Sequence, residues 1–128
     1  LLHSSNIYYI EPQVQLAEKL HELSGGMRAF FCNSGAEANE AAIKLARKYR
    51  STRGDSRREI ITTFDSFHGR TYGSLAATGQ PKYHEGFEPM PGGFTYVERN
   101  NFEALKNAVN ENTAAILLEP IQGESGVW

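Results

Sequence analysis

Three short polar segments of the sequence carry residue types that could do chemistry, and each one follows an apolar stretch. They span residues 33–37 (Asn-Ser-Gly-Ala-Glu), 66–70 (Ser-Phe-His-Gly-Arg) and 119–124 (Glu-Pro-Ile-Gln-Gly-Glu). The first is typical of a phosphate-binding turn, the second pairs an aromatic ring with a guanidinium group, and the third carries two carboxylates.

The first segment joins an apolar run to the start of an alanine-rich helix. Ser34 and Glu37 have the spacing of a capping box, and the free N–H groups of a first helical turn, together with the helix dipole, attract anions. Gly35 would let a phosphate approach the backbone. The same pattern also fits a capped helix that binds nothing. The segment has neither the glycine–lysine signature of a P-loop nor a Gly-x-Gly-x-x-Gly or Gly-x-Ser-x-Gly pattern.

The second segment could hold a flat ligand that carries a carboxylate. Phe67 could stack on a heteroaromatic ring, and the planar fork of Arg70 suits a carboxylate, with Gly69 allowing a sharp turn between them. The alternative is a core phenylalanine, a solvated His68 and an arginine in a surface ion pair.

The third segment is less specific. Glu119 and Glu124 could form the acid pair of a glycosidase, but their position on one loop fixes no separation between them. One buried ion pair and one exposed glutamate would explain them equally well. A hydrolase using Ser34, His68 and Glu119 has the required residue types and no further support.

The elements that must position these segments alternate between helix and strand. Periodicity predicts helices over residues 12–23, 36–53, 71–78 and 102–109, and strands over residues 27–32, 59–64, 94–97 and 114–118. Residues 79–93, rich in Gly and Pro, are predicted to be irregular. Such alternation favours an α/β fold with parallel strands. Ligands then bind at the carboxyl ends of the strands, which are the positions after Cys32, Phe64 and Leu118.

Composition narrows the classes of function. The 128 residues are 40% hydrophobic with a net charge of −2, so no basic field points to nucleic acid or to an anionic membrane. No apolar run approaches the roughly 18 residues of a membrane helix. The single cysteine, Cys32, cannot form an intrachain disulfide, and we expect it to pack in the core. A reducing, cytoplasmic compartment is the default.

Taken together, the three segments resemble the class III, pyridoxal-phosphate-dependent aminotransferases. The strings that carry the resemblance are Phe31-Cys32-Asn33-Ser34-Gly35-Ala36-Glu37-Ala38-Asn39-Glu40, Phe67-His68-Gly69-Arg70-Thr71 and Glu119-Pro120-Ile121-Gln122-Gly123-Glu124. Residues 41–49 (AAIKLARKY) and 79–87 (GQPKYHEGF) are most similar to the acetylornithine branch of that family.

The resemblance implies part of a fold-type I large domain, with a mostly parallel sheet and helices on both faces. It implies a homodimer, pyridoxal 5'-phosphate as cofactor, and amino transfer between N-acetylornithine and 2-oxoglutarate in arginine biosynthesis. By the same resemblance the cofactor-binding residues would be Ser34, Gly35, Ala36, Phe67 and Glu119, and the substrate-binding residues Arg70 and Glu124. Gly35 and Ala36 would bind the phosphate, Phe67 would stack on the pyridine ring, and Arg70 would bind a substrate carboxylate.

The family also needs a Schiff-base lysine, an aspartate for the pyridine nitrogen and a small C-terminal domain, all of which lie downstream of the third segment. None of the five lysines, Lys19, Lys44, Lys48, Lys82 and Lys106, fits the family's lysine motif. We therefore expect residues 1–128 to be one partial cofactor-binding domain of a longer cytoplasmic protein, inactive alone. An organellar form is left open.

Two other functions remain open beside the hydrolase. One is a different class III ω-aminotransferase, acting on succinylornithine, ornithine or 4-aminobutyrate. The other is a non-catalytic module that binds a phosphorylated ligand at the start of the long helix.

Overall fold

The structure, a computed structural model, describes residues 4–5 and 7–124, and the chain divides into the units Leu1–Phe31 and Cys32–Trp128. The first unit contains helix α1 (Glu11–Leu23), close to the predicted bounds, with a proline in its first turn. Gly25 and Gly26, both with positive φ, follow its last turn and end it.

The strand predicted over residues 27–32 is wrong. The segment belongs to no helix or sheet among the described residues. A strand needs a neighbour to pair with its N–H and C=O groups, and no other segment of the described chain pairs with this one. Met27 and Phe30 are accordingly 70% and 73% exposed.

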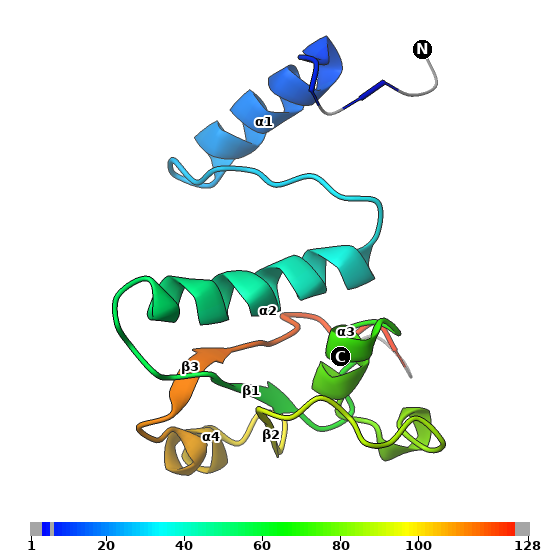
Figure 1. The fold of residues 1–128 in the computed structure, drawn as a ribbon, viewed down its shortest axis with the longest axis vertical. Coiled ribbons are helices and arrows are strands. Elements are labelled where there is room, and N and C mark those ends of the chain that lie inside the picture. The colour runs from blue at the N-terminus through cyan, green and yellow to red at the C-terminus, as the bar shows by residue number, and fades with distance from the viewer. Residues whose placement is uncertain (1–3, 6, 125–128) are drawn as a thin grey trace. The chain divides into compact units, whose positions relative to one another are not determined.

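A three-stranded parallel sheet forms the centre of the second unit. The strands are β1 (Glu59–Thr63), β2 (Phe94–Val97) and β3 (Thr113–Ile116), in the order β2-β1-β3. All three were predicted from the sequence, and their parallel pairing confirms the predicted α/β fold (Figure 1). Their carboxyl ends share one edge, which is where chemistry was expected.

Helices cover both faces of the sheet. The second unit contains α2 (Gly35–Ser51), α3 (Tyr72–Ala77) and α4 (Phe102–Ala108), and α2 and α4 lie on opposite sides of the strands (Figure 1). Ile60 and Ile61 point to opposite faces of β1, yet each is only 1% exposed. Ile60 packs with Ile43 of α2 and Ala77 of α3.

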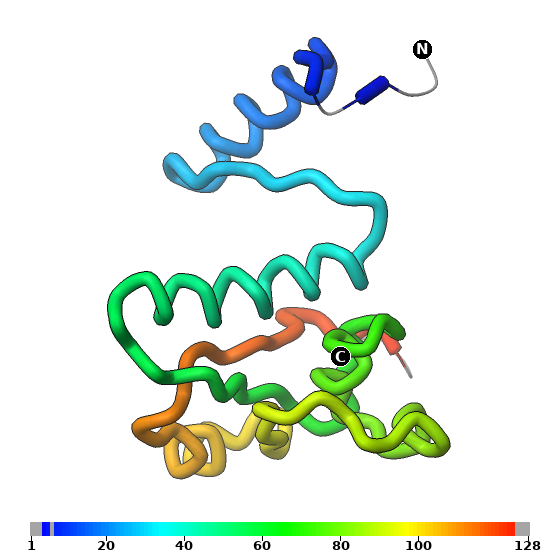
Figure 2. The backbone as a smooth tube through the Cα atoms, viewed as in Figure 1, coloured from blue at the N-terminus to red at the C-terminus, as the bar shows by residue number. Residues whose placement is uncertain are grey.

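Between β1 and β2 the chain makes a long excursion that can be followed in the tube view (Figure 2). It passes through α3 and then a single 3₁₀ turn, Pro81–Tyr83, within the segment predicted to be irregular. Glu88-Pro89 is a cis peptide bond in this stretch.

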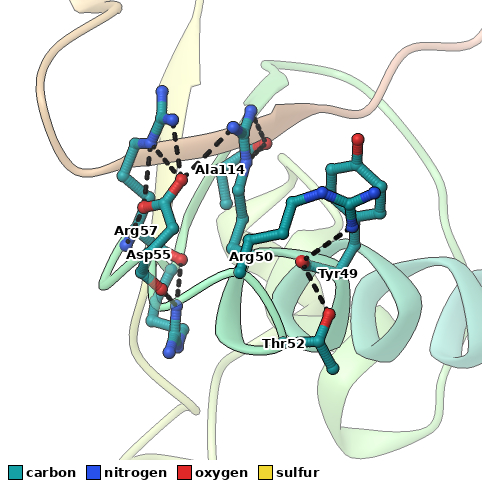
Figure 3. Close-up of polar contacts among 8 residues, drawn as sticks. Tyr49, Arg50, Thr52, Asp55, Arg57 and Ala114 are labelled. Carbon is teal, nitrogen blue, oxygen red and sulfur yellow. Dashed lines mark hydrogen bonds and ion pairs between the residues drawn. The ribbon is translucent and has the colours of Figure 1, made fainter.

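Arg50, near the end of α2, satisfies an irregularity in β3. The register between β1 and β3 shifts at Ala114, so that Glu59 pairs with Thr113 and Ile60 with Ala115. The guanidinium of Arg50 donates from Nε (3.2 Å) and Nη2 (3.1 Å) to the carbonyl oxygen of Ala114 (Figure 3). It thereby ties α2 to the bulged strand.

Asp55 completes this cluster. Its carboxylate accepts from Nη1 of Arg50 at 3.3 Å and from Nη2 and Nε of Arg57 at 2.7 and 2.9 Å (Figure 3). Hydrogen bonds from the Arg57 side chain and backbone, with the charges of Arg57 and Arg50, hold the pKa of Asp55 well below its usual range.

Stability of the full-length protein should therefore depend on Asp55 in a pH-dependent way. The depressed pKa contributes stability that is complete above the unfolded pKa of about 4 and is lost as the pH falls below it. Asp55→Asn should lower the thermal midpoint at pH 7, and the difference from wild type should shrink progressively as the pH falls from about 4 toward the depressed folded pKa of Asp55. Asp65→Asn, at an exposed aspartate with no ion pair in the described chain, is the control. A constant Asp55→Asn difference across this range would contradict the assignment.

Candidate functional site

The start of α2 leaves two backbone N–H groups available. Ser34 caps the helix, its Oγ accepting from the N–H of Glu37 at 3.2 Å. The carboxylate of Glu37 accepts from the N–H of Asn33 at 2.8 Å, one residue earlier than a capping box would place it. The N–H groups of Gly35 and Ala36 have no hydrogen-bond partner within the described residues. They can therefore bind an anion, favoured by the helix dipole.

The second segment packs directly on the first turns of α2. The side-chain amide of Asn39 donates to the carbonyl oxygen of His68 at 2.7 Å. Gly69 has a φ of +128°, and a Cβ there would lie 2.8 Å from the Cβ of Ala36 and 2.6 Å from Oγ of Ser74. Glycine is required at this position for both its conformation and its close approach. The first two predicted segments are thus neighbours in space.

Glu40 of α2 locks this arrangement. Its Oε1 accepts from Oγ1 of Thr71 at 2.7 Å and from the N–H groups of Gly73 and Ser74, both at 2.9 Å, so it caps α3 from a different helix. Burial alone would raise the pKa of Glu40, but these hydrogen bonds and the charge of Lys44 lower it. The ionised carboxylate of Glu40 is therefore the form that accepts these hydrogen bonds.

His68 has a structural environment rather than a catalytic one. It is buried, and its ring Nε2 lies 2.9 Å from Oγ1 of Thr62. Its backbone N–H donates to Oγ1 of Thr78 at 2.9 Å. Burial lowers the pKa of His68 and favours the neutral ring. A solvated His68 is therefore wrong, and its imidazole pairs with Thr62 instead of Ser34, so the hydrolase triad is not formed.

The third segment reaches the second through Glu119. Its Oε2 accepts from the N–H of Phe67 at 3.0 Å, across 52 residues of sequence. Both residues are half-buried. This contact holds a carboxylate beside the aromatic residue, at the carboxyl ends of β1 and β3.

Tyr83 lies among the predicted site residues, although no sequence pattern pointed to it. Its ring meets that of Phe67 edge to face, with centroids 5.9 Å apart at 76°. The guanidinium carbon of Arg70 lies 5.4 Å from its centroid, and its hydroxyl donates to Oε1 of Glu124. Three predicted site residues therefore meet at one tyrosine. The segment GQPKYHEGF contributed to the resemblance, but nothing in its local pattern marked Tyr83 as a site residue.

Arg70 is an exposed cation with no hydrogen bond or ion pair in the part of the chain that the structure describes. It borders a cavity of about 370 Å³. The lining residues are Arg70, Tyr72, Leu75, Lys82, Tyr83 and Phe87. A guanidinium that lines a small, partly aromatic cavity and has no hydrogen bond or ion pair among the described residues suits a carboxylate ligand.

A second cavity, of about 430 Å³, lies at the carboxyl ends of all three strands. Thr63, Val97 and Leu118 line it beside Glu119 and the buried Gln122. This second cavity thus lies where ligands bind in parallel α/β sheets.

Cys32, metal binding and membrane helices are separate from this site. Cys32 is exposed, so the expectation of a core cysteine is wrong; its thiol lies 3.4 Å from the carbonyl oxygen of Ser34. The described residues hold no group of three side chains able to bind a metal ion. Nor does any helix in residues 4–5 and 7–124 combine the length and apolar character needed to cross a membrane.

This fold and this set of groups define a parallel α/β protein in which a helix start with two unbonded N–H groups packs against a loop that carries an aromatic ring and a guanidinium. Comparison with known proteins agrees. The family described as aminotransferase class III matches residues 1–128. The chain therefore belongs to the class III aminotransferase family.

Two curated relatives show how similar the chain is to proteins of this family. The chain is 61% identical over 128 residues to the acetylornithine aminotransferase of Methanocaldococcus jannaschii and 58% identical to that of Myxococcus xanthus. Each match covers 99% of this chain and 32% of the relative. The chain thus spans about a third of the length of these relatives.

Solved structures share the fold. The ornithine aminotransferase of Toxoplasma gondii matches with a TM-score of 0.86 at 29% identity, over 97% of this chain and 30% of that one. An (S)-enantioselective omega-transaminase of Thermomicrobium roseum matches with a TM-score of 0.83 at 35% identity, over 92% and 32%. The chain is therefore a fragment of the fold-type I α/β architecture, as the resemblance implied.

The contact between residue 69 and α2 should be sensitive to a single methyl group. Gly69→Ala should destabilise the full-length protein by about 2–4 kcal/mol, because it adds a left-handed backbone cost to a steric clash. Gly86→Ala is the matched control, since Gly86 has a φ of +81° but no atom lies within 4 Å of where its Cβ would be. Urea unfolding measures both. Equal losses for the two variants would show that the close approach contributes nothing.

Proposed function

We propose that this chain is the first part of the cofactor-binding domain of an aminotransferase that exchanges an amino group between N-acetylornithine and 2-oxoglutarate, a step of arginine biosynthesis. One observation carries the proposal. The anion site of α2 adjoins a loop that presents Phe67 and the unpaired Arg70. The names of the relatives at 58–61% identity support the choice of substrate.

The residues fit pyridoxal 5'-phosphate as the cofactor. The N–H groups of Gly35 and Ala36 can bind its phosphate without a lysine, and no atom lies within 4 Å of where a Cβ of Gly35 would be. The aromatic ring of Phe67 can lie against its pyridine ring. When bound, the cofactor supplies an electron sink for the substrate carbanion.

Each remaining residue has a defined task. Ser34 holds the first turn of α2 in place by accepting from Glu37, so that the two free N–H groups stay aligned. Glu119 fixes the backbone of Phe67 and thereby the position of its ring. Arg70 binds a substrate carboxylate, and Glu124 accepts a hydrogen bond from Tyr83, which lines the same cavity as Arg70.

The rest of the site belongs, in this proposal, to the other two thirds of the protein. We place there the lysine that bonds the cofactor, the aspartate for the pyridine nitrogen and the small C-terminal domain. Residues 1–128 then form one partial large domain without activity of its own. A homodimer and a cytoplasmic location complete the proposal.

The identity of the amino donor is the most specific part of the proposal. The structural similarity to an ornithine aminotransferase and an omega-transaminase keeps ω-amino donors such as ornithine as the second candidate. Small changes in a pocket shift such preferences by only about 1–3 kcal/mol.

Turnover by the full-length protein tests the function. With pyridoxal phosphate and 2-oxoglutarate, N-acetylornithine should give glutamate with a higher kcat/KM than ornithine, succinylornithine or 4-aminobutyrate. A preference for one of the other donors would redirect the substrate assignment. No turnover of any amino donor, with the cofactor bound, would favour a non-catalytic binding module.

Replacing Arg70 should weaken the binding of substrate and leave the binding of cofactor unchanged. In the full-length enzyme Arg70→Ala should raise the KM for 2-oxoglutarate by roughly tenfold to a hundredfold, as expected for losing a charged hydrogen-bond pair. Bound pyridoxal phosphate, measured by absorbance, should remain near wild type. Arg53→Ala is the control, because the Arg53 guanidinium also lies over a tyrosine, Tyr49, at 3.7 Å, but just beyond the last residue of α2, at the end of the helix opposite to Ser34. Loss of cofactor with unchanged substrate binding would contradict the role of Arg70.

A further inference from the structure

The cavity beside Arg70 is lined by two cations and, among the described residues, by no acid. Arg70 and Lys82 both line this space of about 370 Å³, and the other four lining residues are aromatic or aliphatic. Arg70 follows β1, whereas Lys82 lies in the 3₁₀ turn Pro81–Tyr83. Two separate segments therefore bring positive charge to the same small space.

One aromatic ring lies beside both cations. The guanidinium carbon of Arg70 is 5.4 Å from the centroid of the Tyr83 ring, and Nζ of Lys82 is 4.8 Å from the same centroid. These contacts are attractive and use none of the N–H donors of either cation. Within the described residues neither cation forms a hydrogen bond or an ion pair, so their donors remain available to a ligand.

We propose that Lys82 is a second cation of the substrate site and binds, together with Arg70, the same substrate carboxylate. The inference rests on the proposed function, in which Arg70 binds a carboxylate of the substrate. It adds a residue that determines specificity, because a carboxylate is attracted by both charges and a neutral group of the same size by neither. It assigns no step of the reaction to Lys82.

The physical reason is the repulsion between two like charges that line one cavity. Without a ligand the ammonium and the guanidinium repel each other, and a carboxylate bound between them is attracted by both. The two groups contribute differently to binding. The planar guanidinium orients the carboxylate through paired N–H donors, whereas the ammonium adds a compact charge on a flexible stem.

The alternative is a lysine whose stem covers Tyr83 while its charge does nothing for the ligand. Lys82 is exposed, and long cationic side chains commonly lay their stems on apolar surface. The two cases differ in the effect of the charge alone. A substitution that keeps the stem and removes the charge therefore separates them.

The test uses the full-length holoenzyme and glutarate, a dicarboxylate without an amino group, as a binding probe. Lys82→Met should weaken glutarate binding, measured by calorimetry, by roughly threefold to tenfold, between the effect of an exposed ion pair and that of a hydrogen bond to a charged group. KM for 2-oxoglutarate should rise in parallel, with kcat changed much less. Lys82→Arg restores the charge and should bring glutarate affinity back to within about twofold of wild type.

Lys106→Met is the matched control, since Lys106 is an exposed lysine in the last turn of α4 that lines neither cavity. It should leave glutarate affinity and the KM for 2-oxoglutarate unchanged. Equal cofactor content and thermal midpoints establish that the Lys82 variants are folded.

The outcomes separate this inference from the proposed function. An active wild type whose glutarate affinity is unchanged by Lys82→Met, or a loss that Lys82→Arg does not restore, would overturn this inference alone. A wild-type holoenzyme that neither turns over any amino donor nor binds glutarate would overturn the proposed function as well.

Discussion

The candidate site depends on one contact, the packing of the loop after β1 against the start of α2. Glu40 accepts three hydrogen bonds from that loop and from the start of α3, and Asn39 holds the carbonyl of His68. Gly69 permits the approach because it lacks a Cβ. Asn39 and Glu40 of α2 thus hold the loop that carries Phe67 and Arg70 against the helix start that offers free N–H groups.

The parallel sheet explains why residues far apart in sequence meet there. The carboxyl ends of β1, β2 and β3 share one edge, so the loops that follow β1 and β3 are neighbours. Glu119 then reaches the backbone of Phe67 with a single hydrogen bond. The buried polar pairs beneath, such as Thr62 with His68, support the loop rather than supply reactive groups.

Local patterns predicted the elements that local forces determine. The β-branched run of β1 and the alanine-rich α2 form within a few residues of the expected bounds. The segment over residues 27–32 shows the limit, since a strand depends on a distant partner and not on its own composition. For the same reason the burial of His68, the exposure of Cys32 and the central place of Tyr83 could not be predicted: each depends on contacts between segments that the sequence places far apart. The roles assigned to the site residues remain predictions.

The most direct test of these site assignments is a crystal structure of the full-length protein with pyridoxal phosphate and a bound carboxylate substrate. We expect the phosphate within hydrogen-bond distance of the N–H groups of Gly35 and Ala36, Phe67 against the pyridine ring, and the carboxylate on Arg70. A phosphate bound elsewhere, or a carboxylate that leaves Arg70 unpaired, would contradict them.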